Sequence, residues 1–168
     1  MADWGKALRQ AARIGMDLLK YGQRRSAPAP TADPRRSGAR QAPTADRADK
    51  IVYAPNPDGA ADPGEVVWAW VPFEEGDGRG KDRPLLVVGR RGGELAALML
   101  SSRHDRQGDR DWVSIGSGAW DRQGRESFAR LDRVLEVGEQ DIRREGAVLD
   151  RARFDRVADQ LRTRFGWR

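Results

Sequence analysis

Three cationic side chains stand close together in one glycine-rich stretch, residues 77–84, which reads DGRGKDRP. Arg79, Lys81 and Arg83 alternate there with Gly and Asp. A guanidinium is a planar fork that can bind two phosphate oxygens at once, and an ammonium adds a compact point charge. The stretch therefore predicts an edge that grips phosphate. The simpler alternative is that Arg83 forms a surface ion pair with Asp82 or Glu75.

Hydroxyl and carboxylate groups form a second set of candidates. Ser101 and Ser102 stand where an apolar run ends, so they either donate to a phosphate or cap backbone groups of a strand end. Arg130 and Asp132 are two residues apart in an alternating run, which places both on one face of a strand. The simplest interpretation of this pair from the residues alone is a solvated ion pair that contributes little stability.

The chain has 168 residues, no Cys and one His. These counts exclude disulfides, thiolate nucleophiles and a His-rich metal centre, and we expect no metal and no cofactor. His104 lies two residues after Ser102. It is either an acid or base that works near neutral pH or an exposed loop residue among charged neighbours.

The net charge of +5 is unevenly distributed. Residues 1–50 hold 11 Lys and Arg against 5 Asp and Glu, whereas residues 51–168 hold 20 against 21. A polyanion must therefore bind the folded part through a local patch. No run approaches the roughly 20 apolar residues of a membrane span, and no signal-peptide core is present. We expect a cytoplasmic protein.

Short apolar segments and turn signals indicate a mainly β fold. Strands are expected at Gly64–Val71, Leu85–Val88 and Leu95–Leu100, with a turn at Gly92-Gly93, and further strands at Trp112–Ile115 and Phe128–Val137. Both faces of Gly64–Val71 are apolar, so this strand should be covered on both sides. One helical turn is expected around Ile142, and a final helix should run from an Asp150 cap to Phe165, with Gly166 as its stop.

The chain divides into three predicted parts. Residues 1–22 have the spacing of an amphipathic helix. Residues 23–61 are rich in Ala, Pro and Arg, so we expect a disordered linker. Residues 62–168 form the predicted domain. The helix either docks on that domain or binds a partner or a membrane surface.

The order of five features resembles the MazF/PemK family of bacterial toxins. These are Gly64-Glu65-Val66-Val67-Trp68, the Gly-rich loop ending in Arg83-Pro84, the apolar run ending in Ser101-Ser102, Arg130-Leu131-Asp132, and the closing helix. The resemblance covers about residues 62–166 and implies an α+β, mainly β fold, a small SH3-like antiparallel barrel with a C-terminal helix. It also implies a homodimer that cleaves single-stranded RNA without a metal and is held inactive by an antitoxin protein.

The resemblance also implies roles for individual residues. Arg83 would stabilise the phosphate and serve the leaving group, Ser101 would position the phosphate, and Asp132 would act as a base beside Arg130. The expected RNA-binding residues are Arg79, Lys81, Ser102 and Trp120. Trp112 and Trp120 flank a Gly-rich segment, where they either stack on bases or pack at the edge of the core.

The loop departs from the family pattern. A carboxylate–amide pair and a His are missing, and Lys81 stands where the family has Gly. Two alternatives to an endoribonuclease therefore remain. One is a non-catalytic module on the same fold that binds RNA, DNA or a protein. The other is a toxin that acts on DNA gyrase, which a supercoiling assay would separate.

Overall fold

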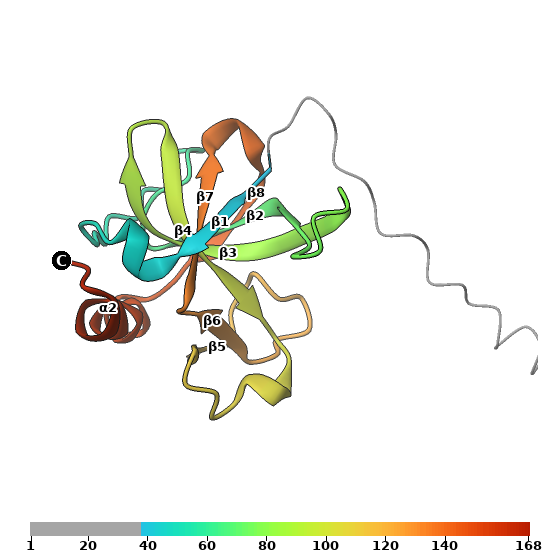
Figure 1. Cartoon of the computed structure of the whole chain (residues 1–168). Helices are drawn as coiled ribbons and strands as arrows, with labels where there is room; N and C mark the ends of the chain where they lie inside the picture. The colour runs from blue at the N-terminus through green and yellow to red at the C-terminus, as the bar shows by residue number, and fades with distance from the viewer. Residues whose placement is uncertain (1–37) are drawn as a thin grey trace, which may run out of the picture.

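The computed structural model describes residues 38–168, with only the backbone described for residues 144–146. The helix expected over residues 1–22 lies outside the described residues. Figure 1 shows a mainly β fold with an α-helix near the C-terminus. The elements are β1 (Arg40–Pro43), η1 (Thr44–Arg47), β2 (Glu65–Pro72), β3 (Gly80–Arg91), β4 (Glu94–Ser101), η2 (His104–Arg106), β5 (Trp112–Gly116), β6 (Ser127–Arg130), β7 (Arg133–Gly138), η3 (Glu139–Asp141), β8 (Ile142–Val148) and α2 (Arg151–Phe165).

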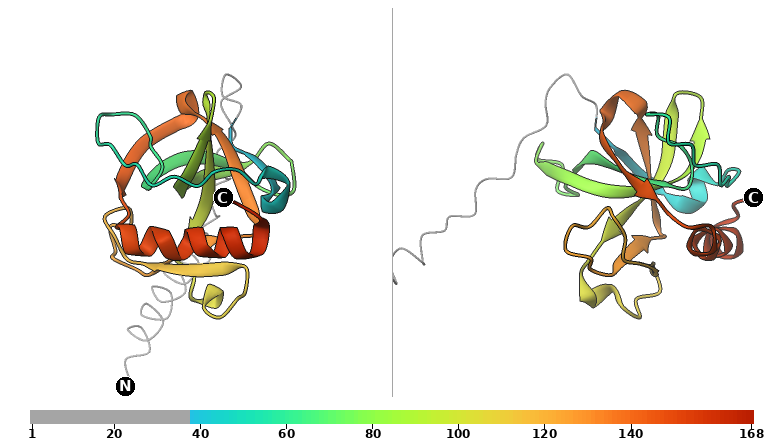
Figure 2. Two further views of the ribbon diagram at one scale, coloured as in Figure 1. Left: turned by 90° about the vertical axis from the view of Figure 1, so that its left-hand side faces the viewer. Right: turned by 180° about the vertical axis from the view of Figure 1, so that it is seen from behind.

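The strands form a curved antiparallel sheet (Figure 2). Its main path runs β1-β7-β4-β3-β2-β8, and the β5–β6 pair joins it through β4. In the part of the chain that the structure describes, β1 and β8 do not pair with each other, so the expected closed barrel is corrected to an open sheet. β8 meets β2 with register shifts at Val66/Val67 and Trp68/Ala69. Such bulges bend and twist a strand locally, which separates the two edges.

The three apolar runs predicted as strands are the central strands β2, β3 and β4. Neighbouring residues of β2 point into two different cores, with Val66 in one cluster and Val67 in the other. The strand is therefore buried on both faces, as its sequence predicts. Gly92, with a φ of +60°, allows the tight turn between β3 and β4. β3 begins at Gly80, so Lys81 and Arg83 lie on a strand and not in the expected loop.

Residues 38–61 are part of the ordered fold, which corrects the linker expected over residues 23–61. β1 pairs with β7 over four residues, and the Ala39 amide donates to the Trp70 carbonyl at 3.1 Å. Thr44 and Ile51 are both buried. Composition misses this segment because backbone pairing with an existing strand edge needs few large apolar side chains. Residues 23–37 lie outside the described residues.

The run expected as one strand over residues 128–137 is broken into β6 and β7 at residues 131–132. β6 pairs with β4 and β5, whereas β7 pairs with β1 and β4. The helical turn expected around Ile142 is a 3₁₀ turn over Glu139–Asp141, and Ile142 itself begins β8.

The C-terminal helix α2 agrees with its sequence signals. The Asp150 side chain accepts from the Arg153 amide at 3.1 Å, and Gly166 ends the helix at a φ of +74°. Phe154, Val157 and Leu161 are buried against one face of the sheet. Figure 2 shows α2 running beside β5 and across the strands. No helix among the described residues is long and apolar enough to cross a membrane.

Candidate functional site: a cationic cavity where two strands separate

The candidate site opens where β4 leaves β3. The two strands pair up to Leu85 opposite Met99. The next residues of β4 pair with β6 instead, with Ser101 opposite Phe128. Continuing the β3–β4 register by two residues would set Arg83 opposite Ser101, just beyond the last pair. These two side chains thus stand at the point where the ladder splits, which leaves room for a ligand between them.

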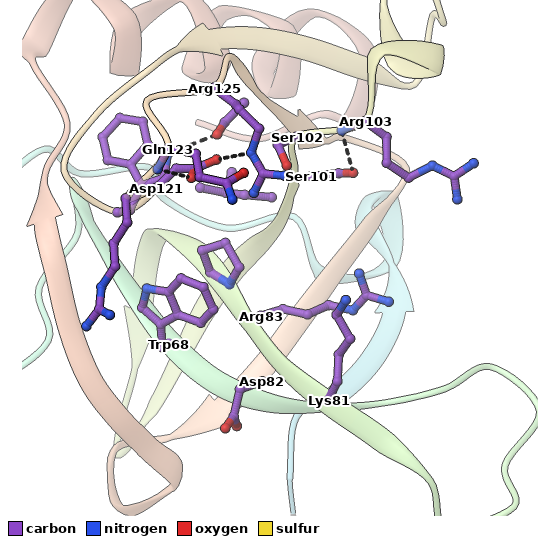
Figure 3. Close-up of a pocket in the computed structure, with 15 residues that line it drawn as sticks. Trp68, Lys81, Asp82, Arg83, Ser101, Ser102, Arg103, Asp121, Gln123 and Arg125 are labelled. Carbon is purple, nitrogen blue, oxygen red and sulfur yellow. Dashed lines mark hydrogen bonds and ion pairs between the residues drawn. The ribbon is translucent and has the colours of Figure 1, made fainter. Parts of the chain in front are cut away.

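A cavity of about 660 Å³ occupies this gap, and we call it the main cavity. One wall comes from β2 and β3, the other from the end of β4, and the loop between β5 and β6 covers a third side (Figure 3). Its lining residues are Trp68, Lys81, Asp82, Arg83, Pro84, Leu100, Ser101, Ser102, Arg103, Trp120, Asp121, Arg122, Gln123, Arg125 and Ser127.

A second hollow of about 380 Å³ lies on the other side of the same wall. Three residues, Arg83, Ser101 and Arg103, line both spaces. The second hollow is lined by Gln41, Val71, Pro72, Phe73, Glu74, Glu75, Arg83, Met99, Ser101, Arg103, Arg106, Trp112 and Arg130. A chain-like ligand laid across the shared wall would therefore place one unit in each space.

Arg83 is half-buried and forms no ion pair with a carboxylate of the described chain. Its neighbour Asp82 instead binds Arg143, with Nε and Oδ1 2.9 Å apart. Burial lowers the pKa of the Arg83 guanidinium, and the positive charge of Arg106 lowers that pKa further. A desolvated cation that faces another cation favours an anion between them, and so the ion pair with Asp82 or Glu75 is not the explanation of Arg83.

Ser101 caps the strand end, and the phosphate role weighed from the sequence stays a prediction. Its Oγ accepts a hydrogen bond from the Arg103 amide at 3.3 Å, which caps the end of β4. The hydroxyl is half-buried and lines both spaces, so its proton can still be donated to a ligand. Ser102 lines only the main cavity.

Arg130 and Asp132 are brought together, although not along one strand. Asp132 accepts from Arg130 at 2.7 and 3.1 Å, and Glu74 accepts from the same guanidinium at 2.9 Å. The bond to Asp132 raises the pKa of Arg130 against the opposing effect of burial, and Glu74 raises it further. Arg130 lines the second hollow, whereas Asp132 lines neither space. Asp132 therefore holds Arg130 in place with both of its oxygens.

Residues 62–165 match the family described as PemK-like, MazF-like toxin of type II toxin-antitoxin system. The chain belongs to this toxin family. A solved structure of MazE-MazF (Form-II) from Deinococcus radiodurans is similar, with a TM-score of 0.52 and 20% identity over 65% of this chain and 98% of that chain. At that identity the likeness shows the fold. No curated protein matches the sequence.

The structure places the other expected RNA-binding residues of this PemK/MazF-like toxin differently. Lys81 is exposed on the wall of the main cavity. Arg79 is bound to Asp77, with Nε and Oδ2 2.6 Å apart, and lines neither space. Trp120 is 4% exposed, and its indole N–H donates to Ser127 Oγ at 3.0 Å. Its ring packs in the core and also lines the main cavity, so the packing alternative is observed and the stacking role of Trp120 stays a prediction.

Sequence reasoning missed the loop of residues 117–126, which covers the main cavity of the toxin. Asp121 holds the loop in shape: it binds Arg125 at 2.8 Å and accepts from the Gln123 amide at 2.9 Å. Both contacts lower the pKa of Asp121, the Arg125 bond most. Arg122 and Gln123 line the cavity. The Asp-Arg-Gln-Gly turn at residues 121–124 was the available signal.

A second missed feature is the stacking of Arg106 on Trp112, with the guanidinium carbon 4.6 Å from the ring centroid. Both residues line the second hollow. His104, by contrast, is exposed and lines neither space. Within residues 38–168, no three His, Asp or Glu side chains gather in a way that would hold a metal ion.

Proposed function

We propose that this toxin is a metal-independent, sequence-selective endoribonuclease that cleaves single-stranded RNA. The observation that carries the proposal is Arg83, a half-buried cation that pairs with no described carboxylate and stands beside the Ser101 hydroxyl at an open cavity. RNA supplies what this site lacks, an anion with two oxygens that fit one guanidinium. Family membership supports the same substrate class.

The reaction needs three contributions from the chain. The 2′-oxygen attacks phosphorus and the 5′-oxygen leaves, so a base must take one proton, an acid must supply one, and donors must stabilise the phosphorane. Arg83 binds the developing negative charge, and its lowered pKa makes it the better proton donor to the 5′-oxygen. Ser101 donates to a second phosphate oxygen. The products are a 2′,3′-cyclic phosphate and a free 5′-hydroxyl.

The general base that takes the proton of the 2′-hydroxyl has three carboxylate candidates near the second hollow. Asp132, expected as the base, has both oxygens bound to Arg130. Two carboxylates line the second hollow, and of these Glu74 also binds Arg130. Glu75 is exposed there and pairs with no described cation, so we propose Glu75 as the base. Arg130 then stays in its ion pairs with Asp132 and Glu74 and forms part of the wall of the second hollow.

The proposed function also implies a second copy of the chain and an antitoxin as binding partners. We propose that the toxin is a cytoplasmic homodimer and that a MazE-like antitoxin blocks the main cavity. The support is the family and the similarity to the MazE-MazF structure. An antitoxin segment that places a carboxylate near Arg83 would satisfy the same unpaired cation as a phosphate does.

The test is cleavage of a mixed single-stranded RNA in EDTA, with mapping of the cut ends. Wild type should cut at a short sequence and leave a cyclic phosphate, and Arg83→Lys should be strongly slowed because it keeps the charge but loses the fork. Arg91→Lys is the matched control, since Arg91 lies on β3 and pairs with Asp49 away from both spaces. If wild type and the Arg83 variant are equally inert, the enzyme proposal is wrong.

A second candidate, a non-catalytic module that binds RNA or a protein, rests on a specific observation. The carboxylate expected as base, Asp132, is occupied by Arg130. On this alternative, wild type binds single-stranded RNA with a salt slope of about −0.7 per phosphate contacted and leaves the RNA intact. Cleavage that is lost in Glu75→Gln while RNA binding is kept would exclude it.

A further inference from the structure

Arg106 and Trp112 come from different elements and meet in the second hollow. Arg106 ends η2 and Trp112 begins β5. The guanidinium lies over the indole ring at 4.6 Å, and both side chains are half-buried. A guanidinium held face-down on an aromatic ring keeps its N–H groups in the plane of the fork. Those donors therefore remain available at the edge of the stack.

The charge of Arg106 is poorly neutralised. Within the described chain, Asp105 is the carboxylate in reach, and its Oδ1 is 3.6 Å from Nε, beyond a hydrogen bond. The other oxygen of Asp105 accepts from Arg103 at 2.7 Å. Arg106 Nε is buried and has no hydrogen-bond partner. Arg103 and Arg106 thus share one carboxylate, and Arg83 on the same wall pairs with no described carboxylate.

Arg130, another arginine of the second hollow, is neutralised in a different way. Arg130 is bound by Asp132 and Glu74, so its positive charge is neutralised within the protein. Arg106 is instead held by an aromatic ring, which fixes its position without cancelling its charge. A purely structural arginine needs a carboxylate or a carbonyl to offset its desolvation. Arg106 has the geometry of a preorganised anion contact.

We propose that Arg106, held on Trp112, binds the phosphate that neighbours the scissile one. The assignment rests on the proposed cleavage of RNA. Because Arg83 and Ser101 line both spaces, RNA whose scissile phosphate lies on them extends from the main cavity into the second hollow. The next phosphate on that side then reaches the Arg106 fork. Arg106 is a binding residue that fixes the register of the RNA, and it takes no part in proton transfer.

The first experiment measures binding of a 2′-O-methyl oligonucleotide, which cannot be cleaved because its 2′-oxygen is blocked. We expect Arg106→Gln to reduce the slope of log affinity against log salt by about 0.7, the value for one phosphate on a single strand. Arg106→Lys keeps the charge and should restore most of the slope. Arg110→Gln removes the same charge from an exposed position of the same loop outside both spaces, so it should change the slope much less.

The second experiment locates the phosphate. Oligonucleotides carry one uncharged methylphosphonate linkage, moved one position at a time along the strand. At the linkage next to the scissile one, on one side, the neutral linkage and Arg106→Gln should be non-additive, because each removes the same contact. At linkages farther away, the two effects should add. Additivity at every position would overturn the assignment.

The outcomes separate this inference from the proposed function. If wild type cleaves RNA but Arg106→Gln leaves the salt slope and the cleavage sites unchanged, the Arg106 assignment is wrong and the enzyme stands. If wild type binds no single-stranded RNA, both fail. If Arg106→Gln weakens binding of an antitoxin peptide but not of RNA, the contact serves a protein carboxylate, and the phosphate assignment is again wrong.

Discussion

Replacing Arg83 with Met should make the folded protein more stable, and the sign of this change tests the reading of the site. Met keeps an unbranched apolar stem of similar reach but removes a desolvated charge that faces Arg106 and has no described carboxylate partner. Groups kept for function at the expense of the fold typically release about 0.5–2 kcal/mol when replaced. We expect a gain of about 1 kcal/mol, in the lower half of this range, since Arg83 is only half-buried.

The assay is urea unfolding followed by Trp fluorescence, with the midpoint and the slope compared between proteins. A gain of ~1 kcal/mol corresponds to a rise in Tm of about 2–4 °C for a chain of this size. Arg90→Met is the control on the same strand: Arg90 donates to the Ala61 carbonyl at 2.7 Å and binds Glu139, which, with Asp62, raises the pKa of Arg90. That variant should lose ~1 kcal/mol, a modest figure because the pair is partly exposed.

The destabilisation caused by the Arg83 charge depends on pH in one direction. The pKa of Arg83 is lower in the folded state than in the unfolded chain, so the unfolded state holds this proton more tightly. The destabilisation is fully present below the folded-state pKa and is relieved only as the pH rises through it, far above neutrality. The gain in Arg83→Met should therefore be the same at pH 6 and pH 8.

Anion binding gives an independent check. A phosphate that occupies the site stabilises wild type by RT ln(1 + [L]/Kd), or about 2.7 kcal/mol at 100 times Kd. Arg83→Met should lose this response, while Arg90→Met should keep it. The reasoning is refuted if Arg83→Met is destabilised as much as Arg90→Met and responds to phosphate as wild type does, since Arg83 would then be a structural residue.

Three further changes test the surroundings of the site. Asp150→Ala removes the side chain that accepts from the Arg153 amide, so denaturant unfolding should show a loss of about 1 kcal/mol with little change in RNA binding. Ser127→Ala leaves the buried Trp120 indole N–H without its acceptor and should cost about 1–3 kcal/mol by the same measurement. Asp121 has a pKa lowered from 3.8, so its stabilising contribution is present above that value and lost as the pH falls through the folded-state pKa. Acid unfolding of Arg125→Gln should accordingly be less steep below pH 3.8 than that of wild type, and an unchanged curve would contradict the role of this pair.

The parts of the fold that sequence predicted well are those with local signals. β2 and β4 are apolar runs bounded by turns, and α2 has both a cap at Asp150 and a stop at Gly166. β1 was missed because its four residues gain their order from pairing with β7, which lies about ninety residues away in the sequence. No local pattern records such a partner. The open sheet was missed for the same reason, since closure depends on how β1 and β8 end up placed.

The candidate site also contains residues that the sequence predicted and residues that it missed. Arg83 and Ser101 were singled out by the resemblance to the toxin family, and the structure sets both on the wall of one cavity. Trp120 fits the packing alternative weighed from the sequence, because the Ser127 hydroxyl, seven residues along the chain, accepts from its indole N–H inside the core. Arg106 was not noticed because its meaning depends on a ring six residues along the chain and on a charge from another strand.

The charge distribution explains why the site must work through contacts. The folded part, residues 38–168, holds 23 Lys and Arg against 23 Asp and Glu, so it has no net charge that would attract RNA over a long range. Many of its arginines are paired, among them Arg90 and Arg130. Affinity then has to come from guanidinium groups left unneutralised inside the cavity walls, of which Arg83 is one and Arg106 another. A site built this way should show a salt slope of only a few phosphates, and it should favour RNA over other polyanions by fit and not by charge.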